Sequence, residues 1–173
     1  RGKNGGSGFN IELLVSQKEG VLATLSEFHY LRRIGQYGMV GNSTNYAMAL
    51  YPEVSLSRNK VRSKIREDKK LCRAIEITSQ LAQLEEFHRY MMPELVKPED
   101  LYTILKDKGY DWDWLLEHTR SWHTLDDEKH PGYPLSTLDL CRIAKGQYRP
   151  YWLCEDNRTV KPHYAKLKGE NHG

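Results

Sequence analysis

The chain has 173 residues, of which 39% are hydrophobic and 28% charged, and its formal net charge is +3. A chain of this length buries roughly two-thirds of its unfolded surface on folding, so one domain forms without help from a metal or a disulfide. Eleven Tyr and four Trp exclude the aromatic-poor composition of a disordered chain, and the lack of any apolar run near 20 residues excludes a membrane span.

The three cysteines, Cys72, Cys141 and Cys154, are widely spaced and form no C-x-x-C pair. This pattern favours free thiols in a reducing, cytoplasmic compartment over a disulfide framework or a zinc knuckle. Residues 1–8 are rich in glycine and lack the apolar core of a signal peptide, so we expect a flexible linker remnant there. Residues 9–154 are predicted to form a single α+β domain, and residues 155–173 a basic, partly disordered tail.

The first half of the chain is predicted to contain most of the strands. Residues 9–16 are β-prone, and residues 21–34 carry apolar side chains at the three- and four-residue steps of an amphipathic helix. A buried strand is expected at 46–51, ending at Pro52, and the alternation of residues 72–77 predicts another. The expected sheet is small and mixed, with strands near residues 9, 45, 60 and 72.

The second half is predicted to be mainly helical. Helical spacing covers 80–92, the segment that starts at Pro98, and 111–122, and Ser136 is a plausible cap for a helix at 136–144. A long loop is expected at 123–134 and an edge strand at 151–154. The fold class predicted is therefore α+β, with a small mixed sheet packed against several helices.

The positive charge is concentrated in two stretches. Residues 54–73 hold eight Lys and Arg against two acids, a net +6, and residues 142–168 hold seven against two, a net +5. Residues 85–130 between them hold twelve acids against six bases, a net −6. Such segregation is typical of a nucleic-acid-binding surface, although each run is also compatible with a solvated face that balances the acidic middle.

Within the first stretch the cations fall on every second residue: Arg58, Lys60, Arg62, Lys64 and Arg66. If this segment is a strand, all five side chains share one face and form a row that neutralises phosphates. In the second stretch cations alternate with aromatic residues, which suits backbone contact combined with stacking on exposed bases. The DNA-binding residues predicted there are Arg142, Lys145, Tyr148, Arg149, Tyr151 and Trp152.

Two patterns suggest catalysis or metal binding as alternatives. Glu76 on a predicted strand, with Glu12 or Asp68 as a partner acid, suggests a metal-dependent nuclease of restriction-endonuclease type, but Thr78 stands where such enzymes have Lys. The loop from His123 to His130 offers two imidazoles and three carboxylates, which are ligands for zinc or another divalent ion. The predicted site nevertheless includes no catalytic residue, no metal and no cofactor.

The order of elements resembles a known family. A strand with a sheet-borne acid (residues 74–80), a Trp-bearing helical stretch (110–122) and the sequence Lys129-His130-Pro131-Gly132 are similar to the carboxy-terminal domain of TnsE-like transposon target-selection proteins. The resemblance spans roughly residues 9 to 145. Where the family has an Asp-rich strand end, this chain has Thr78-Ser79-Gln80.

The resemblance implies a non-catalytic accessory factor that binds DNA and directs transposition or replication-linked recombination. Its implied partners are DNA with recessed 3′ ends or fork structures, the replication sliding clamp and other transposition proteins, and its implied location is the nucleoid of a bacterial cytoplasm. Clamp contact is expected to lie in sequence upstream of residue 1. A protein–protein interaction module, whose acidic middle docks a basic partner, is a further alternative.

Overall fold

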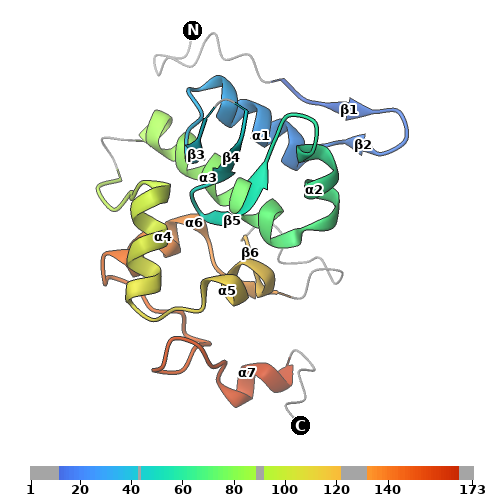
Figure 1. Ribbon diagram of the computed structural model, residues 1–173. Helices are drawn as coiled ribbons and strands as arrows, with labels where there is room; N and C mark the ends of the chain where they lie inside the picture. The colour runs from blue at the N-terminus through green and yellow to red at the C-terminus, as the bar shows by residue number, and fades with distance from the viewer. Residues whose placement is uncertain (1–11, 43, 89–91, 122–131, 168–173) are drawn as a thin grey trace, which may run out of the picture.

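The computed structural model describes residues 12–42, 44–88, 92–121 and 132–167 (Figure 1). The fold is α+β: the described residues form seven helices and several small sheets. The longest helix, α3 (Lys69–His88), runs through the middle of the molecule and packs against helices on several sides (Figure 1). The partners of α3 are α1 (Ala23–Arg33), α2 (Val61–Glu67), α5 (Trp112–His118) and α6 (Thr137–Ala144).

Three short sheets accompany the helices. The hairpin of β1 (Val15–Ser16) and β2 (Gly20–Val21) is antiparallel, and so is the sheet in the order β3 (Met39–Gly41), β4 (Tyr46–Met48) and β5 (Tyr51–Leu56). A parallel pair joins β6 (Thr119–Arg120) to β7 (Tyr133–Pro134). Of the strands predicted near residues 9, 45, 60 and 72, the one near 45 is present, while the segments near 60 and 72 are helical and the prediction is wrong there. Residues 9–11 lie outside the described residues, and the end of that predicted strand forms β1.

The strand predicted at 72–77 belongs to helix α3. The buried residues Leu71, Ala74, Ile75, Thr78 and Leu81 recur at steps of three and four, which is the period of a helix packed along one face. Over only six residues, the buried positions of a helix can also fit the two-residue period of a strand. The alternation of residues 72–77 was therefore misleading. Packing of α3 on several sides also buries Ile77, so isoleucine at both 75 and 77 does not indicate a strand.

The predicted strand at 46–51 is interrupted by a turn at Ala49 and Leu50, and β5 begins at Tyr51. We expected the strand to end at Pro52, but Pro52 lies inside β5. This position is allowed because β5 is the edge strand of its sheet, where the missing N–H of proline leaves no ladder hydrogen bond unmade.

Several predicted helices are confirmed. The segment 21–34 forms α1, and Pro98 starts α4 (Pro98–Asp107) with Glu99 and Asp100 in its first turn. Ser136 caps α6: its hydroxyl accepts a hydrogen bond from the Asp139 N–H at 3.1 Å, and the Asp139 carboxylate accepts one from the Ser136 N–H at 3.0 Å. The second half is mainly helical, as predicted.

Other predictions are correct in part or lie outside the described residues. Helix 80–92 is the second half of α3, helix 111–122 is the shorter α5, and the edge strand at 151–154 reduces to one bridge between Leu153 and Val160. The tail contains helix α7 (Pro162–Leu167), and Val160 and Ala165 are buried. Residues 1–8, most of the loop at 123–134, and 168–173 lie outside the described residues.

Candidate nucleic-acid interface

The five cations predicted to form a strand-borne row lie on helix α2 and the turn before it. Arg58 and Lys60 belong to the turn, in which the N–H groups of Lys60 and Val61 both donate to the Ser57 carbonyl at 3.0 Å. Val61 and Ile65, four residues apart, turn the inner face of α2 toward the core. The row of five on one face is therefore wrong.

The helix groups these cations differently from a strand. Residues four apart share a side of a helix, so Arg62 and Arg66 are neighbours, and so are Lys60 and Lys64. Lys64 is partly buried, whereas the other four side chains are exposed. The result is a cationic arc around the outer surface of α2, which we call the α2 surface: Arg58, Lys60, Arg62, Lys64 and Arg66.

Glu19, in the turn between β1 and β2, holds two of these arginines. Arg62 Nη2 lies 3.1 Å from Glu19 Oε2, and Arg66 Nη2 lies 2.5 Å from Glu19 Oε1. The hydrogen bonds from Arg66 and then from Arg62 lower the pKa of the Glu19 carboxyl below its usual value. The side chains stay open to water, with 54% of Arg62, 55% of Arg66 and 37% of Glu19 exposed.

The positive potential extends onto helix α1. Partial burial lowers the pKa of His29, and the nearby charges of Arg32 and Arg58 lower it further. Arg32 also lies over the Tyr46 ring, 5.6 Å from its centroid. Helix α1, 26 to 29 residues before Arg58 in the sequence, thus contributes to the positive potential around the α2 surface.

The cations of residues 142–161 are mostly engaged with the protein itself. Arg149 Nη2 donates to the Cys154 carbonyl at 2.6 Å, Arg158 Nε to the Gly109 carbonyl at 3.1 Å, and Lys161 Nζ to the Tyr151 carbonyl at 2.8 Å. Arg142 pairs with Glu94 at 3.4 Å, while Lys145 is exposed at the end of α6. Arg158 and Arg142 thus tie the C-terminal segment to the rest of the fold, while Arg149 and Lys161 hold the segment together internally.

Trp152 is a correction to the predicted stacking surface. Its side chain is fully buried, its ring stacks on Tyr133 with centroids 4.9 Å apart, and its Nε1 donates to the Pro134 carbonyl at 3.1 Å. A ring with no exposed area has no face for a base. Tyr148 is partly buried against the core, and burial raises the pKa of its hydroxyl. Of the three predicted aromatics, Tyr151 is the most exposed, at 51%.

The residues of the nuclease alternative do not lie on a sheet. Glu76 is on α3, where its Oε2 accepts from Arg73 Nη1 at 2.6 Å and its Oε1 from Gln80 Nε2 at 3.2 Å. Glu12 pairs instead with Arg33 at 3.2 Å. Within the described residues, no group of three or more His, Cys, Asp or Glu side chains is arranged to hold a metal ion, and the loop 123–130 lies outside them.

No sequence pattern pointed to Glu27, which is on α1 and faces α3. Burial raises its pKa to about 7, with a further increase from the Glu76 charge and an opposing effect of Arg73. Arg73 is buried, donates to Glu76 and to the Leu135 carbonyl, and has no partner for its Nε among the described residues. This cluster lies in the α1–α3 contact that supports the α2 surface.

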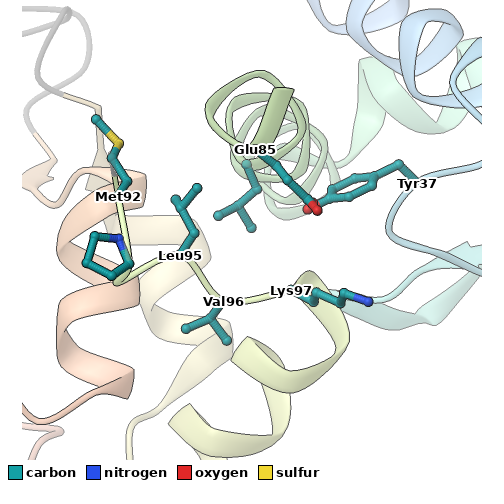
Figure 2. Close-up of a pocket in the computed structure, with 8 residues that line it drawn as sticks. Tyr37, Glu85, Met92, Leu95, Val96 and Lys97 are labelled. Carbon is teal, nitrogen blue, oxygen red and sulfur yellow. The ribbon is translucent and has the colours of Figure 1, made fainter. Parts of the chain in front are cut away.

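A cavity of about 250 Å³ lies at the other end of α3 (Figure 2). Its wall is formed by Leu81 and Glu85 of α3, by Tyr37 and by five residues between Met92 and Lys97. Figure 2 shows the Tyr37 hydroxyl directed at the Glu85 carboxylate, which is its hydrogen-bond partner. Burial is the main cause that raises the pKa of Tyr37, and this hydrogen bond raises it further. The Glu85 carboxylate in the wall disfavours the binding of phosphate. The cavity therefore differs from the α2 surface both in its position and in the ligands that it suits.

Comparison with family models, curated proteins and solved structures gave no match. The resemblance to TnsE-like proteins accordingly stays a prediction. Among the helices of the described ranges, none has both the length and the apolar character needed to cross a lipid bilayer.

Proposed function

We propose that this protein binds DNA without cleaving it, using the α2 surface to contact backbone phosphates. The observation that supports the proposal is that few acidic side chains pair with these five cations. Arg62 and Arg66 share one acid, Glu19, and among the described residues Arg58, Lys60 and Lys64 have no acidic partner within ion-pair distance. Cations without an acidic partner release counterions from DNA when they contact phosphates.

In the part of the acidic middle that the structure describes, no acid pairs with a cation of the α2 surface. From the first basic stretch, the ion pair that reaches residues 85–130 within the described structure is Lys70 with Asp113, at 3.5 Å, and it lies at the start of α3. A solvated face that merely offset the acidic segment would pair with it more extensively. The arrangement therefore favours an external anionic partner over internal balance.

The finer role, an accessory factor in transposition or replication-linked recombination, rests on the resemblance to TnsE-like proteins. It makes duplexes with recessed 3′ ends the most informative probe, with blunt duplexes for comparison. The sliding clamp and other transposition proteins belong to the same proposal.

The experiment compares the wild-type chain with the variant Arg58→Gln, Arg62→Gln, Arg66→Gln. The matched control is Lys97→Gln, Lys106→Gln, Lys108→Gln, which removes three exposed cations on or beside α4. At about 50–100 mM salt we expect the α2 variant to lose roughly 10- to 100-fold in DNA affinity, measured by fluorescence anisotropy, and the control to lose about threefold or less.

The same samples, incubated with Mg²⁺ or Mn²⁺, test the alternatives. We expect the DNA to remain intact. Cleavage that Glu76→Ala abolishes would establish the nuclease in place of the binder. Absence of DNA binding at physiological salt would favour the protein–protein interaction module, and equal affinities for the wild type and the α2 variant would remove the α2 surface from the site.

A further inference from the structure

Two guanidinium groups converge on a single carboxylate at the edge of the α2 surface. Arg62 Nη2 contacts Oε2 of Glu19 at 3.1 Å and Arg66 Nη2 contacts Oε1 at 2.5 Å, so each carboxylate oxygen has its own arginine. A phosphodiester also carries one negative charge and presents two non-bridging oxygens. Arginine pairs bind carboxylates and phosphates with the same geometry, so the position of Glu19 is also suited to a backbone phosphate.

The Glu19 side chain is held by little besides this contact. It belongs to the turn of a hairpin whose strands are two residues each, and a two-stranded hairpin has marginal stability of its own. The apolar side chains of the hairpin contribute little burial, since 69% of Val15 and 57% of Val21 are exposed. Figure 1 shows the hairpin extending from the body of the molecule beside α2.

The pairing partners are all accessible to water. With more than half of each arginine side chain exposed, an incoming anion reaches both guanidinium groups without rearrangement of the core. Exposed ion pairs of this kind are weak, since water screens them. DNA, which presents many phosphates to neighbouring cations at once, is a stronger competitor than one carboxylate.

We propose that Arg62 and Arg66 form a phosphate-binding site, which Glu19 occupies in the free protein and a DNA backbone phosphate occupies in the complex. Glu19 then moves into solvent, and one negative charge replaces another between the two arginines. This inference rests on the proposed function, because it assigns a particular phosphate contact within the same surface. It makes Glu19 an internal competitor that weakens DNA binding.

The test is the affinity of Glu19→Gln for a duplex with a recessed 3′ end. We expect binding about three- to tenfold tighter than wild type at about 100 mM salt, because the competitor is gone while both arginines remain. Glu19→Ala should act in the same direction. The matched control is Glu53→Gln, which removes one exposed carboxylate on β5 and should leave affinity within about twofold.

A second background separates local competition from a general change in net charge. In Arg62→Gln, Arg66→Gln the addition of Glu19→Gln should give no further gain, because the site that Glu19 competes for is absent. Inorganic phosphate at constant ionic strength distinguishes the two sources of phosphate: the gain persists in phosphate buffer if the site takes DNA backbone. Loss of the gain in that buffer would assign the site to free phosphate and overturn the proposal.

Failure of this inference and failure of the proposed function give different results. If wild type binds DNA but Glu19→Gln binds no more tightly than Glu53→Gln, the phosphate-site inference is wrong and the α2 surface stands. A gain that survives in the Arg62→Gln, Arg66→Gln background also contradicts the inference alone. If no variant binds DNA, both are wrong.

Discussion

The α2 surface and the C-terminal stretch, residues 142–167, are both rich in cations but use them differently. On α2, the partner is one exposed carboxylate, Glu19, and three cations have no acidic partner among the described residues. In the C-terminal stretch, Arg149, Arg158 and Lys161 donate to backbone carbonyls. The comparison teaches that charge density alone does not locate an interface, because the existing partners of each cation decide whether it is available.

The two kinds of partner differ in what a phosphate has to replace. A carboxylate on an exposed turn moves into water at little cost, as any solvated ion does. A backbone carbonyl that loses its donor stays in place and goes unsatisfied, and the loop it anchors loses order. Figure 1 shows α7 at the lower end of the molecule, away from α2.

The largest expected effect concerns Trp152, which separates a core role from a binding role. Trp152→Ala should lower the free energy of unfolding by about 3–5 kcal/mol, because a fully buried ring stacked on Tyr133 is lost. The measurement is urea denaturation followed by circular dichroism. The control is Tyr151→Ala, half-exposed one residue earlier, for which about 1 kcal/mol or less is expected. Equal and small effects of both substitutions would return Trp152 to the list of candidate base-stacking residues.

The next largest effect is a pH dependence of the free energy of unfolding, caused by Glu27 on the α2 side of the molecule. Its pKa is raised from 4.5 to about 7 in the folded state, so the neutral carboxyl favours folding; this contribution is complete below pH 4.5 and is lost as the pH rises through about 7. Glu27→Gln should therefore be more stable than wild type at pH 8, by up to about 3 kcal/mol.

At pH 5 the same difference should shrink to about 1 kcal/mol or less, since the wild-type carboxyl is then neutral in the folded protein. Urea denaturation at the two pH values measures both quantities. Glu53→Gln, an exposed glutamate, supplies the control and should show no such trend. A Glu27→Gln difference that does not change with pH would show that Glu27 titrates normally.

A smaller effect is expected from the arginines that anchor the C-terminal stretch. Arg149→Gln and Arg158→Gln should each lower the free energy of unfolding by about 1 kcal/mol, because each removes a hydrogen bond to a backbone carbonyl. DNA affinity should change by about twofold or less, measured by anisotropy. The opposite pattern, unchanged stability with a tenfold loss of affinity, would place these arginines in the DNA interface.

Sequence patterns predicted the fold well where the local signal was complete. Helix α1 has a regular apolar spacing, and α6 begins at a serine followed three residues later by an acid, so both were recognisable without tertiary information. Helix α3 was missed in its first half because Ile75 and Ile77 favour a strand locally, and packing on several sides of the helix outweighs that preference.

The candidate site was predictable in composition but not in geometry. Arg62 and Arg66 were identified, yet Glu19 lies 43 and 47 residues away, and no local pattern brings it to them. Trp152 shows the same limit, since an aromatic residue between cations has the same sequence signal whether it packs inside or stacks outside. Tertiary packing decides both cases.

The most direct test of the central claim is the salt dependence of DNA binding in two matched triple variants. One is Arg58→Gln, Arg62→Gln, Arg66→Gln on the α2 surface, and the other is Lys145→Gln, Arg149→Gln, Lys161→Gln in the C-terminal stretch. Each phosphate contact contributes about 0.9 to the slope of log affinity against log salt. We predict a slope shallower by about 2–3 for the α2 variant and changed by less than about 0.5 for the other; a larger decrease in the C-terminal variant would contradict the account.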